Sequence, residues 1–172
     1  MRFRLSRKDL LLAECMGRDT VALCDKLMGF KPRLENEKQS RVDANIMGYK
    51  AEIAVARLFD IDLPVINVMT DGGVDLWFDD VAIDVKFTNK EFGPLIFDSM
   101  AKFKAEVAVL VGATSDPSVM RINGAYTQKD FAQHFYRTNF GHGERLVMDA
   151  KDIQPIEWLW LNLMKKRNRA QK

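Results

Sequence analysis

The spacing of apolar residues predicts two helices in the first third of the chain. Residues 10–28 favour one helix, and 40–59 is predicted as a second because its apolar side chains recur three and four residues apart. These side chains are Val42, Ile46, Tyr49, Ile53, Ala56 and Phe59. The polar stretch 31–39, which contains Pro32, is predicted to be a linker between the two helices.

The spacing changes to that of β-structure after Pro64. Strands are predicted over 65–69, 74–78 and 81–87, and the side chains of the third alternate strictly between its two faces. The unbroken apolar run 107–111 indicates a strand that is covered on both faces. Such a strand is expected in the middle of a sheet, beside a parallel neighbour.

Helices and strands alternate in the rest of the chain. A helix is predicted from Pro94 to about Ala105, because proline is favoured in the first turn of a helix. The remaining predicted elements are strands over 120–125 and 146–148 and helices over 128–136, capped by Thr127, and 156–166. The order of helix, three strands, helix and strand predicts an α/β domain whose mixed sheet is flanked by helices.

The composition fits one globular domain and excludes several chemistries. The chain has 172 residues, 47% of them hydrophobic, and no apolar run approaches the ~18–20 residues that cross a bilayer. No secretory signal is recognised, so a cytoplasmic location without a membrane partner is expected. The two cysteines are too few for a disulfide framework, and the two histidines lack the spacing of a zinc site. Phosphate-binding loop and dinucleotide motifs are absent, so the chemistry has to rest on carboxylates and lysines.

Charge is distributed unevenly along the chain. Residues 60–98 contain nine acidic side chains and two basic ones, whereas the first eight residues and the stretch from Lys165 onward are strongly basic. Carboxylates hold cations, and lysines and arginines bind phosphates, so this distribution suits a metal centre approached by a polyanion. The alternative is a solvated surface with a frayed basic tail.

A hairpin predicted over 74–87 carries the candidate chemistry. With residues 79–80 as a two-residue turn, Asp75 lies directly opposite Asp84, with their Cβ atoms ~4.5–5.5 Å apart. Asp84 and Lys86 share one face of their strand. Two facing carboxylates repel each other unless a cation lies between them or one is protonated, and their hard oxygen atoms favour Mg²⁺ or Mn²⁺. A longer turn would shift the pairing, although a bulge could keep both acids on one face.

Glu52 is a further candidate, on the predicted helix 40–59. Its neighbours on the helix surface are mostly apolar, and a buried lone carboxylate is costly, so Lys86 or a metal-bound water is expected to contact it. Gly48, one turn earlier, leaves space for a pocket. The alternative is that Glu52 lies at the edge of the apolar stripe and reaches solvent.

These residues together resemble the PD-(D/E)XK nuclease superfamily. The resemblance is carried by Glu52 on a helix, then Gly73-Val74-Asp75, then Ile83-Asp84-Val85-Lys86. It covers residues 41–112, and the stretches 122–131 and 146–159 are similar to the closing portion of phage-type and Holliday-junction-resolvase-like members. Val74 departs from the pattern, which has proline before the first aspartate.

The resemblance implies a restriction-endonuclease-like core of αβββαβ order. It assigns residues 41–172 to the nuclease domain and leaves 1–40 as an N-terminal helical extension. The implied activity is that of a Mg²⁺-dependent endonuclease that hydrolyses DNA, with Mn²⁺ as a substitute metal and RNA as the less favoured substrate.

The resemblance also implies a role for each site residue. Asp75 and Asp84 are implied to ligate one or two Mg²⁺ ions, with the Val85 carbonyl as a further ligand. Lys86 is implied to position the attacking water or help to deprotonate it, and to balance the charge of the transition state. Glu52 is implied to orient Lys86 or the water.

Other interpretations of the sequence remain open. A non-catalytic nucleic-acid-binding protein could retain the nuclease fold, and an unrelated α/β domain could bind a small anion. Asp84 and Lys86 could form an ordinary surface ion pair. Trp158 and Trp160 of the terminal helix suit either the core or a dimer face. A homodimer is expected from the apolar side chains of this helix, and the resemblance also implies one, because many duplex-cutting members cut both strands.

Overall fold

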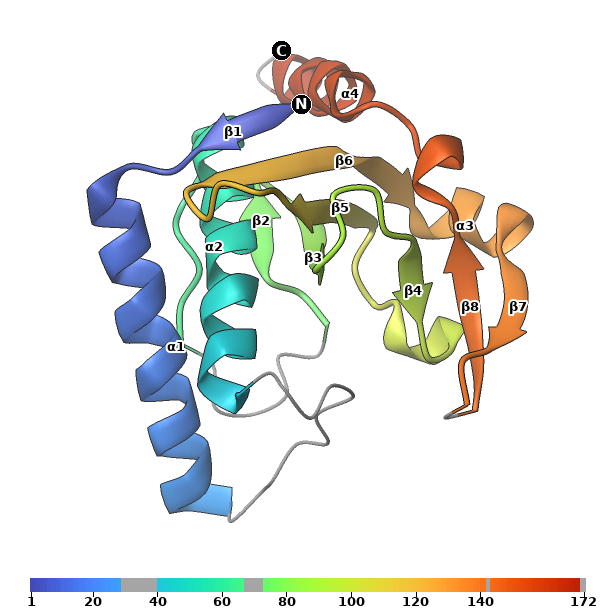
Figure 1. Cartoon of the computed structure of the whole chain (residues 1–172). Coiled ribbons are helices and arrows are strands. Elements are labelled where there is room, and N and C mark those ends of the chain that lie inside the picture. Colours follow the sequence, from blue (N-terminus) through green and yellow to red (C-terminus); the bar gives the residue numbers. More distant parts are fainter. Residues whose placement is uncertain (29–39, 67–72, 142, 171–172) are drawn as a thin grey trace.

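A mixed β-sheet forms the centre of the computed structural model, which describes residues 1–28, 40–66, 73–141 and 143–170 (Figure 1). The sheet is five-stranded, in the order β1, β6, β5, β3, β2. Its strands are β1 (Arg2–Arg4), β2 (Leu76–Phe78), β3 (Val81–Thr88), β5 (Val107–Ala113) and β6 (Val119–Thr127). β3 and β5 are parallel, and the other neighbouring pairs are antiparallel. The predicted mixed α/β fold is therefore confirmed at this level.

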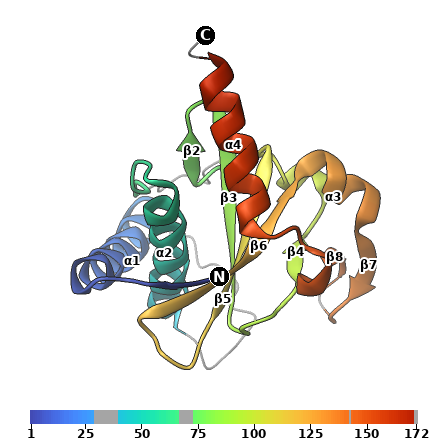
Figure 2. The same cartoon turned by 90° about the horizontal axis from the view of Figure 1, so that it is seen from above.

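Helices cover one face of this sheet, and a smaller sheet covers the other (Figure 2). On the first face, α2 (Arg41–Phe59) packs on Ile83 and Val85 of β3, and α1 (Arg7–Met28) packs against α2. The smaller sheet has the order β4 (Leu95–Phe97), β8 (Glu144–Met148), β7 (Tyr136–Asn139). The remaining elements are α3 (Gln128–His134), α4 (Ile156–Ala170) and the short 3-10 turns η1 (Met100–Lys102) and η2 (Ala150–Asp152).

The helix predicted over 40–59 is confirmed, and its ends have identifiable causes. Ser40 is the N-cap, and its side chain accepts a hydrogen bond from the Asp43 N–H at 3.1 Å. The chain leaves the helix at Asp60, which adopts a left-handed backbone with φ of 51°. Glu52 therefore lies in the middle of a rigid element that is packed on the sheet.

The contact between α1 and α2 depends on Gly17. A Cβ atom at position 17 would lie 2.5 Å from Cγ1 and 2.7 Å from the backbone nitrogen of Ile46, both far inside van der Waals contact. Gly48 on α2 differs, because a Cβ atom there would meet only Glu52 Oε1, at 3.9 Å. Substitutions at these two glycines are therefore expected to change the stability of the protein in opposite directions.

We expect Gly17→Ala to lower the free energy of unfolding by ~1–3 kcal/mol, because the added methyl group pushes α1 away from α2. Gly48→Ala is expected to raise it by ~0.5–1 kcal/mol, since alanine is the better residue in the middle of a helix. Urea denaturation of both variants measures these changes. Stabilisation by Gly17→Ala would show that the two helices do not approach as closely as described.

The start of the chain takes part in the main sheet, which the sequence analysis did not predict. β1 pairs with β6, so that Phe3 lies opposite Met120, and the amino group of Met1 donates to the Ile122 carbonyl at 2.8 Å. A three-residue strand is too short for alternation to be recognised. The segment 1–40 thus contributes an edge strand and α1 to the body of the protein.

The apolar run at 107–111 lies in β5, in the middle of the sheet as predicted. β5 has β3 as its parallel neighbour and β6 as its antiparallel one. Val109 contacts the cluster under α2, and Leu110 contacts the cluster under the smaller sheet. Burial on both faces explains why this strand has no polar position.

The helix predicted over 94–105 is wrong. Leu95 and Phe97 are buried in β4, which pairs with β8, and the chain then forms only the short turn η1. Phe97 stacks on Phe103 with 4.3 Å between ring centroids, so an aromatic cluster holds this segment. The fixed φ of proline suits an extended chain as well as a first helical turn, so Pro94 did not discriminate between the two.

The other predicted elements are reproduced with shifted ends. β2 begins at Leu76 instead of position 74, and α3 ends at His134, so that β7 occupies residues expected to be helix or loop. Of the strand predicted over 65–69, Val65 and Ile66 belong to no strand, and 67–69 lie outside the described residues. The predicted linker 31–39 also lies outside them. None of the helices in the described ranges has the length and apolar character required to span a membrane.

Candidate functional site

The β2–β3 hairpin has the register that the sequence predicts. Residues 79–80 form the turn, and Asp79 adopts a left-handed backbone with φ of 51°. Leu76 pairs with Ile83, and Phe78 pairs with Val81. The short, regular hairpin therefore fixes which residues of β3 lie beside the chain segment that precedes β2.

Asp75 lies where this segment separates from β3. We call this place the fork and define it by Asp75, Asp84, Val85 and Lys86. The Asp75 N–H donates to the Ile83 carbonyl at 2.9 Å, although Ile83 is already the partner of Leu76. The expectation that Asp75 lies directly opposite Asp84 is therefore wrong, because an irregularity of the bulge type ends the regular pairing.

The Asp75 carboxylate, instead of a backbone carbonyl, accepts the next hydrogen bond from β3. Its Oδ2 atom accepts a hydrogen bond from the Val85 N–H at 2.6 Å. The N–H and C=O of one residue in an extended strand point to the same side, so the Val85 carbonyl is directed to the side where the Asp75 carboxylate lies. The fork therefore brings a carboxylate and a backbone carbonyl to the same edge of β3.

Asp84 and Lys86 form an ion pair on the opposite face of β3 from α2. Asp84 is 0% exposed, and its Oδ1 atom lies 2.5 Å from Lys86 Nζ. The Lys86 ammonium group also lies 5.3 Å from the centre of the Phe97 ring. Lys86 retains partial exposure, with 37% of its side chain accessible. A buried carboxylate thus orients an ammonium group that can still reach a ligand.

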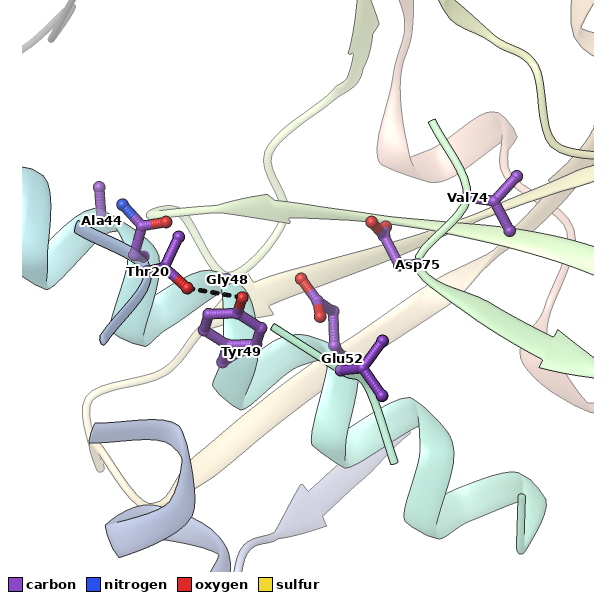
Figure 3. A pocket seen from close by; sticks show the side chains of 9 residues that line it. Thr20, Ala44, Gly48, Tyr49, Glu52, Val74 and Asp75 are labelled. Atoms are coloured by element: carbon purple, nitrogen blue, oxygen red, sulfur yellow. Dashed lines mark hydrogen bonds between the residues drawn. The ribbon is translucent and has the colours of Figure 1, made fainter. Parts of the chain in front are cut away.

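Glu52 projects from α2 toward the Asp75 carboxylate, and both side chains line one pocket (Figure 3). The pocket has a volume of about 340 Å³. Its described lining residues are Thr20, Ala44, Asn45, Gly48, Tyr49, Glu52, Val65, Val74 and Asp75. Gly48 lies in this lining, which agrees with the space that the sequence analysis expected beside Glu52.

The electrostatics of the fork are dominated by acidic groups. Burial, followed by the nearby charges of Glu52 and Asp84, raises the pKa of the Asp75 carboxyl from 3.8 to about 9. The Val85 N–H and the Lys86 ammonium group oppose this rise and do not cancel it. A single ammonium group therefore does not balance the carboxylates around Asp75, and an added cation would relieve their repulsion.

The donor set suits a hydrated hard cation. In the described parts of the chain, no three histidine, cysteine or acidic side chains are already grouped to hold a metal ion. The fork instead offers Asp75, Asp84 and the Val85 carbonyl. Mg²⁺ commonly keeps several water ligands and uses one or two protein carboxylates, so this set is compatible with Mg²⁺ and gives no preference for zinc.

The basic ends of the chain are partly engaged with acidic residues. Arg167 of α4 binds Asp79 of the hairpin turn through two contacts of 2.8 and 3.0 Å, and Lys166 lies 3.0 Å from Asp80. At the other end, Arg2 lies 2.8 Å from Glu91. The side chains of these ion pairs are partly or fully exposed. The pairs of Lys166 and Arg167 attach α4 to the hairpin turn, whereas the Arg2–Glu91 pair attaches β1 to the chain after β3.

The structure places Asp75 between the other predicted site residues. Glu52 lines the same pocket as Asp75, whereas Asp84 and Lys86 lie on the opposite face of β3 from α2, close enough to influence the Asp75 carboxyl.

The structure also adds residues that the sequence pattern does not indicate. Phe97 was missed because its segment was expected to be helical, and Thr20 was missed because α1 was not expected to line the pocket. Trp160 stacks on Phe59 with 5.6 Å between ring centroids, which favours the core interpretation of this tryptophan.

None of the protein-family models, curated proteins or solved structures with which the chain was compared matches it. The geometry and chemistry of the fork are therefore the basis for a functional assignment.

Proposed function

We propose that the protein is a Mg²⁺-dependent nuclease that hydrolyses phosphodiester bonds of DNA, acting as an endonuclease at the fork. The observation that carries this proposal is the position of the Asp75 carboxyl where β2 separates from β3, between Glu52 of α2 on one side and the Asp84–Lys86 pair on the other. An ion pair such as that of Asp84 and Lys86 occurs in many proteins and does not by itself indicate an activity. Together with two further carboxylates and a backbone carbonyl, it suits phosphoryl-transfer chemistry.

Each side chain has a role that follows from its surroundings. Asp75, Asp84 and the Val85 carbonyl would hold Mg²⁺, which polarises the scissile phosphate and makes a bound water more acidic. Lys86 is fixed by Asp84 and would donate to a phosphoryl oxygen as negative charge develops there. Glu52 would accept a hydrogen bond from the attacking water and orient it. Hydrolysis joins the water oxygen to phosphorus and breaks one P–O ester bond, and the leaving oxygen takes up a proton.

The arrangement of elements gives partial support to a restriction-endonuclease-like core. The helix α2, the hairpin β2–β3 and the parallel neighbour β5 follow in the order that the PD-(D/E)XK resemblance implies. The connection from β3 to β5 departs from it, because it contains β4 and η1 instead of a helix. Glu52, Asp84, Val85 and Lys86 lie on the elements that agree, and Asp75 directly precedes β2, so the departure does not remove any proposed role.

Contacts to the DNA backbone would come from basic side chains around the fork. Lys104 is exposed and its Cβ lies near Gly73, two residues before Asp75. Lys166 and Arg167 would bind phosphate only if they released Asp80 and Asp79 of the hairpin turn, with which they form ion pairs. Such contacts bind phosphates without reading sequence and are weakened by salt.

The homodimer stays a prediction. α4 exposes Leu161, which is 58% accessible, beside an apolar depression that includes Met1, Leu58 and Trp160. This surface is compatible with self-association and does not by itself identify a partner.

Incubation of the purified chain with labelled DNA tests the proposed function. Single-stranded, nicked, branched and duplex substrates are compared in Mg²⁺ and in EDTA, and we expect cleavage of at least one substrate in Mg²⁺ only. The products should carry a phosphate on one new end and a hydroxyl on the other.

Binding of DNA without cleavage, unchanged by metal, would instead support the non-catalytic nucleic-acid-binding protein. Cleavage that persists in EDTA would contradict a metal-dependent site.

A further inference from the structure

The pocket beside the fork extends well beyond the residues required for hydrolysis. Asp75 and Val74 lie at one end, and Thr20 and Tyr49 lie at the other (Figure 3). The hydroxyl groups of Thr20 and Tyr49 are 2.8 Å apart, and each residue is 8% exposed. A space of about 340 Å³ therefore connects the candidate hydrolytic centre with a pair of buried hydroxyls.

The charged residues in the described lining of this pocket lie at one end of it. Among its described lining residues, Asp75 and Glu52 are the charged ones, and both lie toward the fork. The other described lining residues are uncharged, and Ala44, Gly48 and Val65 among them are small and apolar. A phosphate inside the pocket would be repelled by the Glu52 carboxylate, and none of the described lining residues is a lysine or an arginine. The lining instead suits an uncharged group that is attached to a phosphate located at the fork.

The pocket also offers hydrogen-bonding groups in defined positions. The Asn45 side-chain nitrogen donates to the Arg41 carbonyl at 2.8 Å, which fixes the orientation of this amide. Asn45, Thr20 and Tyr49 together present amide and hydroxyl groups near apolar walls. Nucleobases require this combination, because they have apolar faces and a polar edge.

The volume limits what can enter. About 340 Å³ lies at the lower end of the ~300–1,000 Å³ range of small-molecule pockets. One nucleoside is of this size, whereas a stacked base pair within a duplex is not. A base that is already unpaired enters such a pocket at the lowest cost, since no pairing has to be broken.

We propose that this pocket binds one unpaired nucleoside of the DNA beside the scissile phosphate. The substrate class is therefore DNA that is single-stranded at the cut, such as a single strand, a frayed end or a flap. This inference rests on the proposed nuclease function and adds the form of its substrate.

The proposal gives α1 a direct part in substrate binding. Thr20 comes from α1, and its hydroxyl contacts Tyr49 of α2. Gly17 lies three residues before Thr20, and its close approach to Ile46 sets the distance between these helices. Helix α1 thus contributes to a pocket whose other described lining residues belong to α2 and to the chain on either side of residues 67–72.

Filling the pocket from Gly48 tests this proposal without changing a carboxylate. A side chain at position 48 points toward Glu52, since a Cβ atom there would lie 3.9 Å from Glu52 Oε1. We expect Gly48→Leu to weaken binding of a single-stranded oligonucleotide about tenfold, because a base can no longer enter. Ala22→Leu on the exposed surface of α1 is the matched control and should bind as the natural protein does. Fluorescence anisotropy with Ca²⁺ in place of Mg²⁺ gives the affinities.

A second experiment uses the unchanged protein and does not depend on the folding of a variant. An abasic residue is placed in turn at each position around the cut of a single-stranded substrate, and cleavage is measured in Mg²⁺. We expect one position next to the scissile phosphate to slow cleavage about tenfold, since removal of its base leaves the pocket empty.

The outcomes separate this proposal from the proposed function. Equal single-strand binding by Gly48→Leu and Ala22→Leu, or cleavage that ignores every abasic position, would overturn the nucleoside pocket while leaving the nuclease intact. A different result would support nucleoside binding and contradict hydrolysis. In that case Gly48→Leu loses single-strand binding, Ala22→Leu keeps it, and the natural protein cleaves no DNA.

Discussion

Replacing Lys86 by methionine is expected to lower the rate of the proposed Mg²⁺-dependent DNA cleavage by about a thousandfold, because in the proposed mechanism the ammonium group stabilises charge that develops on the phosphoryl oxygens. Methionine keeps most of the side-chain volume beside Phe97 and removes the charge. Single-turnover cleavage of a labelled substrate measures the effect. Lys129→Met, an exposed position on α3, is the control and should retain the full rate.

Loss of Lys86 also affects stability, and this effect has to be separated from catalysis. The variant leaves the Asp84 carboxylate, which is fully buried, without its ammonium partner, at a cost of ~3 kcal/mol. The double variant Asp84→Asn/Lys86→Met removes both charges and should recover much of this stability. We expect it to remain inactive. Recovery of cleavage together with stability would mean that the ion pair has only a structural role.

The stability of the metal-free protein should depend on the ionisation of Asp75. The pKa of this carboxyl is raised to about 9 in the folded protein, chiefly by burial and then by Glu52 and Asp84. Between pH ~4 and ~9 the folded state therefore holds a proton that the unfolded state releases. The free energy of unfolding should fall as the pH rises through this window, by up to ~1.4 kcal/mol per pH unit from this one group.

Comparison with Asp75→Asn isolates this contribution from other titrating groups. Urea denaturation in EDTA at several pH values should show that the natural protein loses stability relative to the variant between pH 5 and 9. Mg²⁺ should reverse the trend, because the metal requires the ionised carboxylate and binds better as the pH rises. A constant difference between the two proteins, or one that changes in the opposite direction, would contradict the described environment of Asp75.

The sequence predicts the parts of the fold that depend on local patterns. Alternation over 81–87 and the two-residue turn at 79–80 determine the hairpin register, which is confirmed. The apolar run at 107–111 correctly indicates a central strand. Short segments are less predictable: β1 and β4 have three residues each, and both are defined by pairing with strands distant in the chain.

The sequence indicates candidate residues that lie around Asp75 in the structure, but it does not predict their detailed geometry. Regular pairing predicted that Asp75 faces Asp84, whereas the Asp75 N–H bonds to Ile83 and its carboxylate bonds to the Val85 N–H. A hydrogen bond from a strand to a side chain, in place of a backbone carbonyl, leaves no periodic pattern in the sequence. The contacts of Phe97 with Lys86 and of Thr20 with Tyr49 depend on tertiary packing, so they were equally inaccessible to the sequence pattern.

The rate of DNA cleavage as a function of Mg²⁺ concentration, measured for the natural protein and for Asp84→Asn, tests the central claim most directly. Asp84→Asn keeps the shape of the side chain and removes a proposed metal ligand together with the partner of Lys86. We predict saturable activation by Mg²⁺ in the natural protein and a loss of at least about a hundredfold in the variant, with the fold retained in circular dichroism. Equal rates and equal Mg²⁺ dependence in the two folded proteins would contradict a hydrolytic centre at the fork.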